Sequence, residues 1–261
     1  MNILPPQSGQ VDLWVTQIGT LSDGDQREYK ALLSKDEMGR HNRFVVQSAK
    51  DQFLAARVLL RTTLSRYFEA DPRAWTFQTN DYGRPFISGP FSDTGIYFNL
   101  SHTNGMVVCA ISSSEKIGVD VERCDRVLDT LKLAATVFAP VEAARLSAAS
   151  YLDRRELFFA FWTLKEAYIK ARGMGLWLPL QRFWIDIDRE PMRIHFTDDF
   201  LGESSSWDFW RGAPTEVHRI AVAAAFPGCE TRANVIMRST TALNQSSSPP
   251  VEVDPDFGTS G

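Results

Sequence analysis

The sequence predicts an α+β fold in two similar halves related by a pseudo-two-fold axis. Residues 25–68 show helical periodicity and are followed by strand-like runs up to residue 122, and helices followed by strands return in the same order between residues 128 and 226. The runs MVVCAIS (106–112) and IAVAAAF (220–226) also resemble each other, and each follows a histidine, His102 or His218, by a few residues.

Each expected element rests on a local pattern. The run VDLWV (11–15) has the alternation of a short strand. In the helical segment, Phe53, Ala56 and Leu60 recur at three- and four-residue spacing on one face. Further strands are predicted at 75–79, 95–102, 105–112, 116–122, 182–188 and 219–226, and further helices at 128–149 and 152–172.

The predicted elements divide the chain into three parts. We predict an N-terminal α+β half over residues 1–112 and a C-terminal α+β half over residues 113–237. From residue 238 onward the chain is rich in Ser, Thr, Pro and acidic residues and poor in apolar ones. Because such a composition cannot bury a core, it predicts a disordered tail over residues 238–261.

The composition is that of an ordinary globular protein, with 261 residues, 44% of them apolar and 23% charged. The net charge of −4 lacks the basic excess typical of nucleic-acid binding, so a phosphorylated ligand would need positive charge concentrated locally. Cys109, Cys124 and Cys229 are too far apart for a zinc site or a disulfide framework. The N-terminus shows no secretory signal, and no segment approaches the roughly 20 apolar residues of a membrane span. We expect a cytoplasmic protein with no membrane attachment.

The segment IGVDVE (117–122) places two carboxylates on one face of a strand. Because side chains alternate along a strand, its three aliphatic residues point toward the core, and Asp120 and Glu122 share the opposite face, about 6–7 Å apart. Such a pair can hold a hard cation such as Mg²⁺ with water at the remaining positions. Gly118 lies on the same face and is expected to leave room for a bulky ligand. The alternative interpretation is a half-exposed strand with solvated charges.

The segment FWTLKEAYIKARGMGL (161–176) carries an apolar stripe at helical spacing and a Gly-Met-Gly stop. Glu166 and Lys170 stand four residues apart on another face. One interpretation is an exposed salt bridge that contributes about 0.2–0.5 kcal/mol. The other makes Glu166 a third metal ligand or a base, with Lys165 and Lys170 in contact with phosphate.

A third segment, FNLSHTNG (98–105), ends a strand and enters a turn that contains glycine, a common place for ligand contacts. Ser101 and His102 are its candidate contacts, although a lone histidine is more often structural. The spacing offers no nucleophile elbow for a Ser/His/Asp triad. The sequence also has neither a Walker loop nor a GxGxxG fingerprint.

Taken together and in order, YGRP (82–85), FNLSH (98–102), IGVDVE and FWTLKEAYIK (161–170) resemble the motifs of the larger 4′-phosphopantetheinyl transferases, those of secondary metabolism. The resemblance covers about residues 10–230. It implies that the phosphopantetheine arm of coenzyme A is transferred to a serine of an acyl or peptidyl carrier protein. The apo carrier becomes holo, and adenosine 3′,5′-bisphosphate is released. It also implies a monomeric enzyme that requires Mg²⁺, has its active site in the cleft between the two halves, and serves carriers of polyketide, nonribosomal peptide or fatty acid synthesis.

The resemblance also assigns roles to individual residues. Asp120, Glu122 and Glu166 match the ligands of Mg²⁺, and Glu166 matches the base for the serine hydroxyl. Lys170 is expected to stabilise or protonate the departing phosphate, because attack on a diphosphate builds negative charge on oxygen. Residues that match contacts to coenzyme A are Arg40, Arg43, Arg84, Ser101, His102, Lys165 and Lys170. Within this set, Arg40, Arg43, Ser101 and His102 match contacts to the 3′-phosphate, and Lys165 and Lys170 match contacts near the diphosphate. Carrier domains are usually acidic, so we expect local basic and apolar patches to form the docking face.

Two positions depart from the family pattern, because Glu37 and Gln52 stand where relatives often have a basic residue. Two rival functions follow. One is a non-catalytic module that holds coenzyme A or a carrier domain, which loss of a carboxylate would favour. The other is an unrelated Mg²⁺-dependent phosphotransferase, which would be indifferent to removal of the 3′-phosphate from coenzyme A.

Overall fold

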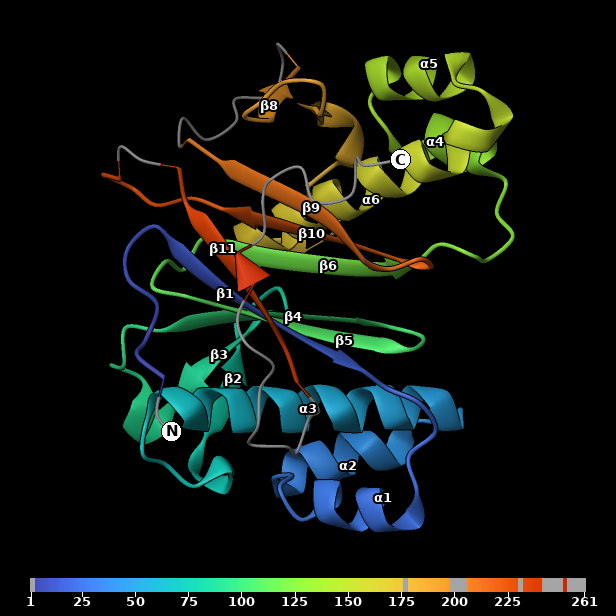
Figure 1. Cartoon of the computed structure of the whole chain (residues 1–261). Helices are drawn as coiled ribbons and strands as arrows, with labels where there is room; N and C mark the ends of the chain where they lie inside the picture. The colour runs from blue at the N-terminus through green and yellow to red at the C-terminus, as the bar shows by residue number, and fades with distance from the viewer. Residues whose placement is uncertain (1–2, 176–177, 198–205, 230–231, 241–250, 253–261) are drawn as a thin grey trace.

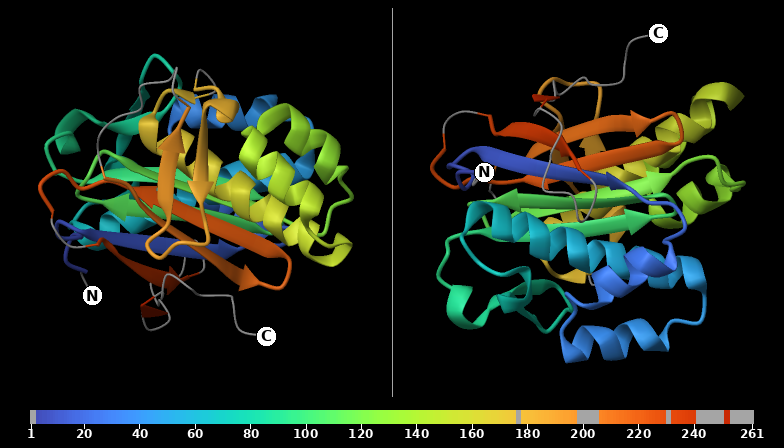
Figure 2. Two further views of the ribbon diagram at one scale, coloured as in Figure 1. Left: turned by 90° about the horizontal axis from the view of Figure 1, so that it is seen from above. Right: turned by 60° about the horizontal axis from the view of Figure 1, so that its bottom comes forward.

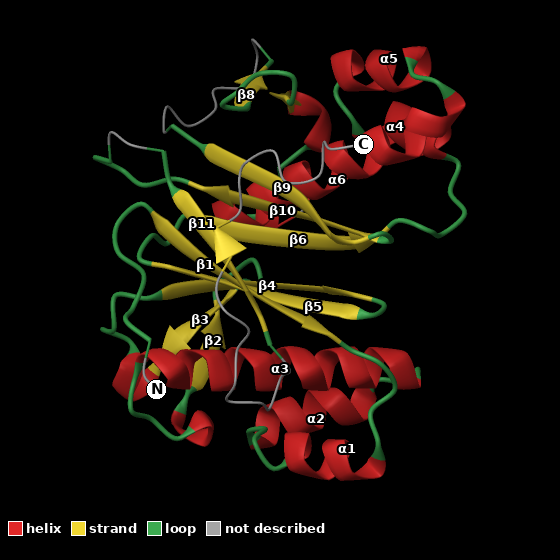
Figure 3. Cartoon of the chain, in the orientation of Figure 1, coloured by secondary structure: helices red, strands yellow, loops and turns green. Residues whose placement is uncertain are grey.

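Two β-sheets face each other, and one long helix lies outside each sheet (Figure 1). The structure is a computed structural model and describes residues 3–175, 178–197, 206–229, 232–240 and 251–252. Helix α3 (Gln47–Tyr67) covers the outer face of the first sheet, and α6 (Tyr151–Arg172) covers the outer face of the second (Figure 3). The predicted α+β class is confirmed.

The first sheet joins the two ends of the chain. Its strand order is β12 (Val251–Glu252), β11 (Asn234–Ser239), β1 (Gln10–Gln17), β5 (Met106–Ser112) and β4 (Tyr97–Thr103). Strand β11 runs parallel to β1, with Val235 opposite Val11, and the other neighbours are antiparallel. The first sheet therefore takes a strand from the C-terminal part of the chain (Figure 2).

The second sheet is antiparallel, with the strand order β6 (Ile117–Arg123), β10 (His218–Ala224) and β9 (Asp208–Thr215). Two small hairpins flank the sheets, β2 (Thr76–Thr79) with β3 (Pro85–Ser88) and β7 (Phe183–Asp186) with β8 (Arg193–Phe196). The strands predicted from the apolar runs of the sequence are present. Strands β3, β8, β9, β11 and β12 were not predicted.

The predicted helical segment 25–68 is three helices, α1 (Asp23–Lys30), α2 (Lys35–Arg43) and α3. Ser22 and Ser34 begin the first two with capping boxes, because each hydroxyl accepts from the backbone amide three residues on while Asp25 or Glu37 accepts in return. The second half contains α4 (Thr130–Val137), α5 (Pro140–Ala148) and α6. Short 3-10 helices lie at Pro72–Ala74, Gly89–Phe91 and Leu180–Arg182.

Strand alternation divides the core into layers. Odd-numbered residues of β5 pack against α3, while its even-numbered residues face the second sheet and meet the aliphatic side chains of β6. A third cluster lies between α6 and the outer face of the second sheet. In the described part of the chain, no helix is both long and apolar enough to cross a membrane.

The end of the chain departs from the predicted tail. Arg238 and Ser239 belong to β11 rather than to a disordered segment, because the strand pairs with β1 and the guanidinium of Arg238 lies 3.4 Å from the buried carboxylate of Asp12. Residues 251–252 form β12. The rest of the predicted tail, 241–250 and 253–261, lies outside the described residues.

Side chains of β4 join the two sheets at the edge where β4 lies beside β6. The backbone amide of Val119 donates to Oδ1 of Asn99 at 3.0 Å, and the amide of Val121 donates to Oγ of Ser101 at 3.3 Å. These bonds satisfy amides that face away from β10. They fix β6, and therefore Asp120, relative to the end of β4.

Candidate functional site

Helix α6 lies unusually close to β6, and Gly118 permits this contact. A Cβ atom at Gly118 would lie 2.0 Å from the carbonyl oxygen of Ala167 and 2.4 Å from the amide nitrogen of Ala171. The space that we expected a ligand to use is therefore filled by the helix backbone. The close packing brings Glu166 and Lys170 of α6 against the carboxylates of β6.

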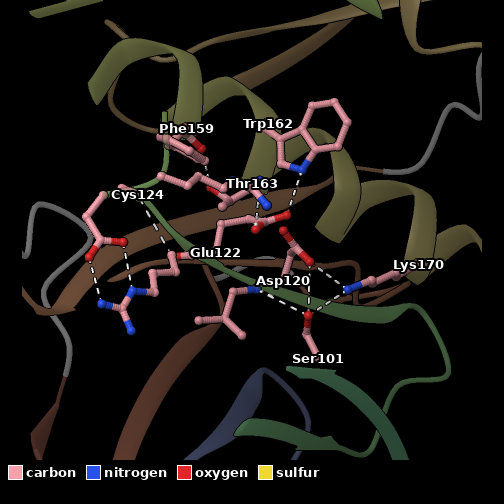
Figure 4. A network of polar contacts seen from close by, with 12 residues as sticks. Ser101, Asp120, Glu122, Cys124, Phe159, Trp162, Thr163 and Lys170 are labelled. Atoms are coloured by element: carbon pink, nitrogen blue, oxygen red, sulfur yellow. Dashed lines mark hydrogen bonds and ion pairs between the residues drawn. The ribbon is translucent and has the colours of Figure 1, made fainter. Parts of the chain in front are cut away.

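Asp120, Ser101 and Lys170 form a compact network at the centre of the site (Figure 4). Nζ of Lys170 donates to Oδ1 of Asp120 at 2.6 Å and to Oγ of Ser101 at 2.8 Å, and the Ser101 hydroxyl donates to the same carboxylate oxygen at 3.0 Å. The Asp120 side chain is only 6% exposed, whereas that of Lys170 is 28% exposed. The ammonium thus lies between a buried carboxylate and the surface.

Glu122 lies two residues further along β6 and points toward α6, as Figure 4 shows. Its Oε1 accepts from the indole Nε1 of Trp162 at 3.0 Å, and its Oε2 lies 3.1 Å from the guanidinium of Arg126. Burial and the nearby charge of Asp120 raise the pKa of Glu122 above its ordinary value. The two carboxylates of β6 are therefore close enough to repel each other.

Glu166 is half-buried on the face of α6 that is turned toward β6. Burial raises the pKa of Glu166, the charges of Asp120 and Glu122 raise it further, and Lys170 lowers it. The charges of Asp120, Glu122 and Glu166 therefore act on one another, and we call these three predicted acids the electrostatic group. A carboxylate whose pKa is raised in this way is a stronger base than an exposed one.

The donor set of this group fits a hard divalent cation. Oδ2 of Asp120 is buried and has no hydrogen-bond partner among the described residues. The available donors are carboxylate oxygens, which Mg²⁺ prefers. In the described part of the chain, however, no three His, Cys, Asp or Glu residues converge closely enough to hold a metal by themselves. The protein oxygens suit Mg²⁺ only if other ligands complete its coordination.

His102 faces the opposite side of β4 from Ser101. Its Nδ1 lies 3.1 Å from Oε1 of Gln52 on α3. Burial lowers the pKa of His102, and the positive charges of Lys170 and Arg57 lower it further. The end of β4 therefore lies between positive groups from α6 and α3.

Among the predicted contacts to coenzyme A, Arg40 and Arg43 are exposed on α2. The guanidinium of Arg40 lies over the ring of Phe53, 5.7 Å from its centroid. Arg84 is held differently, because it donates to the backbone carbonyls of Ala171, Glu115 and Ile117 at 2.8, 2.7 and 3.1 Å. It fastens the YGRP turn to the end of α6 and the start of β6, beside a cavity of about 410 Å³.

Lys165 does not join the group formed by the other site residues. Its ammonium has no exposed surface and donates to Oε2 of Glu142 at 2.6 Å and to the carbonyl of Phe183 at 2.5 Å. Burial lowers the pKa of Lys165 to about 8. The structure gives this lysine a buried ion pair that fastens α5 and β7 to α6, because its place on the helix turns it away from the acids.

Two protein-family profiles match the chain. Residues 116–223 match the profile of the 4′-phosphopantetheinyl transferase superfamily, and residues 23–114 match that of the 4′-phosphopantetheinyl transferase N-terminal region. The chain is 33% identical over 169 residues to 4′-phosphopantetheinyl transferase HetI of a Nostoc species, which covers 65% of this chain and 71% of HetI. This chain belongs to the 4′-phosphopantetheinyl transferase superfamily.

Two other relatives carry the same name. The chain is 35% identical over 187 residues to 4′-phosphopantetheinyl transferase gsp of Aneurinibacillus migulanus, covering 67% of this chain and 75% of gsp. It is 29% identical over 170 residues to 4′-phosphopantetheinyl transferase Sfp of Bacillus subtilis, covering 65% of this chain and 73% of Sfp.

The structure explains both departures from the family pattern. Glu37 is buried and accepts two hydrogen bonds from Arg61, at 3.1 and 2.7 Å. Gln52 contacts His102. Both residues therefore have partners within the fold.

Sequence reasoning missed two residues that support the carboxylates. Trp162 donates to Glu122, and Asn99 holds the backbone of β6 at Val119. Trp162 precedes Glu166 by four residues and so lies on the same helix face. This spacing could have identified Trp162 as a neighbour of the carboxylates. Asn99 shares the strand face of Ser101, but its partner is a backbone amide distant in sequence, which no local pattern reveals.

Proposed function

We propose that this chain transfers 4′-phosphopantetheine from coenzyme A to a serine hydroxyl of an acyl or peptidyl carrier protein. The products are the holo carrier and adenosine 3′,5′-bisphosphate. The observation that carries the proposal is the electrostatic group of Asp120, Glu122 and Glu166, with the ammonium of Lys170 bound to Asp120. Membership of the superfamily and the names of the relatives support it.

The residues of the group have separate tasks in this reaction. The serine oxygen attacks the phosphorus that bears the pantetheine arm, and the bond from that phosphorus to the bridging diphosphate oxygen breaks. Glu166 takes the proton of the hydroxyl, since its raised pKa makes it a suitable base. Lys170, which is partly exposed, stabilises the charge that develops on the departing bisphosphate.

Asp120, Glu122 and Glu166 would hold Mg²⁺, with phosphate oxygens of the donor and water as further ligands. The unpartnered Oδ2 of Asp120 and the mutual repulsion of the carboxylates support this assignment. When bound, the ion would neutralise charge on the diphosphate. Trp162 and Arg126 would hold Glu122 in the orientation that the cation requires.

An exposed apolar and basic surface beside the acids suits a carrier protein. Val127, Tyr151 and Leu152 are 100%, 86% and 86% exposed and line a cavity of about 460 Å³ together with Arg126 and other arginines. Arg126 also pairs with Glu122, so this surface is continuous with the electrostatic group. Acidic residues of a carrier would pair with the arginines while apolar residues cover the exposed side chains.

We also propose the domain arrangement, the oligomeric state and the cellular compartment that were predicted from the sequence. The halves 1–112 and 113–237 are related by pseudo-two-fold symmetry, and the reaction occurs in the cleft between them, near the junction of β4 with β6. The protein acts as a cytoplasmic monomer, and the wide separation of its three cysteines in the sequence supports a reducing compartment. A non-catalytic binding module is the weaker alternative, because all three acids are present and grouped.

Intact-mass spectrometry tests the proposal. An apo carrier domain, coenzyme A and Mg²⁺ are incubated with the chain, and the carrier should gain the mass of one phosphopantetheine. A carrier whose serine is replaced by alanine is the control and should gain nothing. If no apo carrier gains this mass while coenzyme A still binds, the binding-module alternative is correct.

A further inference from the structure

Arg126 lies between the electrostatic group and the surface proposed for the carrier protein. Its Nη2 is 3.1 Å from Oε2 of Glu122, and its side chain is 46% exposed, whereas that of Glu122 is 17% exposed. The same arginine lines the cavity of about 460 Å³ beside Val127, Tyr151 and Leu152. One guanidinium therefore contacts a carboxylate of the electrostatic group and also forms part of the surface proposed for the carrier.

Contacts with α6 hold this guanidinium in place. It lies over the ring of Phe159, a buried residue of α6, 5.4 Å from the ring centroid. Trp162 of the same helix donates to Oε1 of Glu122, so both oxygens of this carboxylate have donors beside them. The helix that carries Glu166 therefore also positions Arg126.

The charge of Arg126 acts on the carboxylates that would hold the divalent cation. Burial and the charge of Asp120 raise the pKa of Glu122, and the charge of Arg126 lowers it. A guanidinium that stabilises the carboxylate in this way also repels a second cation at the same place, and an anion that neutralises the guanidinium removes this repulsion. Because a guanidinium has five N–H donors, Arg126 can bind a carboxylate of a partner and keep its contact with Glu122.

We propose that Arg126 couples carrier docking to cation binding, so that an acidic residue of the carrier on Arg126 strengthens the binding of a divalent cation by the electrostatic group. This coupling rests on the proposed function, which supplies both the carrier and the cation. By linkage, the bound cation must strengthen carrier binding by the same factor. The cation is then held most tightly when an acceptor serine is present.

The coupling is measured with Mn²⁺ as the probe, by electron paramagnetic resonance of the free ion. The chain with coenzyme A is titrated with Mn²⁺ in the presence and absence of a carrier whose serine is replaced by alanine, so that no transfer occurs. We expect the carrier to lower the Kd for Mn²⁺ about fivefold at low ionic strength. This is the lower end of the usual range, because a partly exposed arginine is screened by solvent. Samples without the chain correct for Mn²⁺ bound by coenzyme A or by the carrier.

Substitution of Arg126 tests whether its charge carries the coupling. For Arg126→Met we expect the ratio of the two Kd values to fall to about 1. Arg126→Lys should keep part of the coupling, because it retains the charge but lacks the planar fork of donors. Arg145→Met is the matched control, since Arg145 pairs with Asp188 at 2.6 Å and lies over the ring of Phe161 of α6, 5.7 Å from its centroid. This control should keep the wild-type ratio.

A second control removes a different arginine of the same cavity. Arg154 donates to the backbone carbonyls of Leu146 and Ala149 at 3.2 and 3.1 Å rather than to an acid of the electrostatic group. Arg154→Met should therefore weaken carrier binding and leave the ratio of the Kd values for Mn²⁺ unchanged at a saturating carrier concentration. Calorimetric titration of wild type with the carrier, with and without Mn²⁺, should give the same factor as the titrations with Mn²⁺.

A ratio near 1 in wild type, or a wild-type ratio in Arg126→Met, would overturn the coupling. Failure of the proposed function gives a different result, because wild type would then bind no carrier at all in the calorimetric titration. The coupling would fall with it. If wild type binds both carrier and Mn²⁺ but neither affects the other, the proposed function stands and only the coupling is wrong.

Discussion

Nζ of Lys170 lies 2.6 Å from Oδ1 of Asp120 and joins the last turns of α6 to the centre of β6. This contact, with the hydroxyl of Ser101 shared between the two, places three elements of the chain around one carboxylate oxygen. The other oxygen of Asp120 has no partner among the described residues. The site thus has one hydrogen-bonded and one unpartnered carboxylate oxygen beside the ammonium of Lys170.

Asp120→Asn should abolish transfer while the fold persists. The amide keeps the size of the side chain and an acceptor for Lys170, but it loses the charge that the proposed cation requires. We expect kcat for carrier modification to fall at least about 100-fold. The control is Asp188→Asn, an exposed carboxylate paired with Arg145, which should leave kcat unchanged. Wild-type activity in Asp120→Asn would exclude a role for its charge.

Gly118→Ala should destabilise the fold, because the added methyl would lie 2.0 Å from the carbonyl oxygen of Ala167. The helix would have to move away from β6, at a cost of about 1–3 kcal/mol or more in the free energy of unfolding. Chemical denaturation measures this cost. Gly39→Ala is the matched control, since nothing lies within 4 Å of its added Cβ and helix propensity predicts a gain of up to about 1 kcal/mol. Equal stability of the two variants would contradict the close contact.

Lys165→Met should affect stability rather than the KM for coenzyme A. It leaves Glu142 buried without its ammonium partner, which costs about 3–5 kcal/mol in the free energy of unfolding. Adding Glu142→Gln should restore part of the loss, because the neutral amide still accepts from the backbone of Ala139 or Ile185. If folded Lys165→Met has a raised KM for coenzyme A, Lys165 contacts the nucleotide as the sequence predicted.

The same variant has a defined pH dependence. Burial already raises the pKa of Glu142, and loss of the charge of Lys165 raises it further. The folded chain then binds more protons than the unfolded chain between the unfolded pKa, near 4.5, and the folded pKa. Stability is lost as the pH rises through this window, so the deficit of Lys165→Met should be smaller at pH 5 than at pH 8. Chemical denaturation of wild type and Lys165→Met at the two pH values measures this loss of stability. A loss that is the same at both pH values would contradict a raised pKa of Glu142 in the variant.

Leu152→Asp should weaken carrier binding without affecting the nucleotide. The side chain is 86% exposed in the surface proposed for docking, and a carboxylate there would repel an acidic carrier. We expect the KM for the carrier to rise about tenfold and the KM for coenzyme A to stay constant. Leu4→Asp changes another exposed leucine and should leave both constants unchanged. If the KM for the carrier does not change in Leu152→Asp, the carrier docks elsewhere.

His102 should titrate below its ordinary pKa of 6.5 in the free protein, because it is partly desolvated beside Lys170 and Arg57. Arg57→Met removes one of these charges, so its titration should move upward. Proton NMR of the imidazole ring follows this shift, and His102→Gln identifies the signal among the four histidines. A titration that does not respond to Arg57→Met would place the guanidinium farther from the ring.

Sequence periodicity predicted the elements that have a local pattern and missed those that depend on distant partners. The apolar runs predicted β5 and β6, and the spacing of α6 with its terminal glycine predicted that helix. Strand β11 was not predicted, because its parallel partner β1 lies more than 200 residues away in the sequence. The turns that divide the segment 25–68 contain residues that also suit helices.

For the site, too, the sequence predicted what local patterns determine and missed what packing determines. Strand alternation placed Asp120 and Glu122 on one face, which the structure turns toward α6. The neighbours of Gly118 and Lys165 could not be predicted, because they come from segments that are distant in the sequence. The backbone of α6 packs against Gly118, and Glu142 of α5 pairs with Lys165.

The proposed transfer is tested most sharply when both products of one reaction are followed together. Chain, apo carrier, coenzyme A and Mg²⁺ are mixed, and the mass of the carrier and the released nucleotide are measured over the same time course. We expect one phosphopantetheine to be gained per adenosine 3′,5′-bisphosphate released, and neither product to be formed by Asp120→Asn. Release of the nucleotide without a gain in carrier mass, or an equal rate in Asp120→Asn, would contradict the proposed transfer.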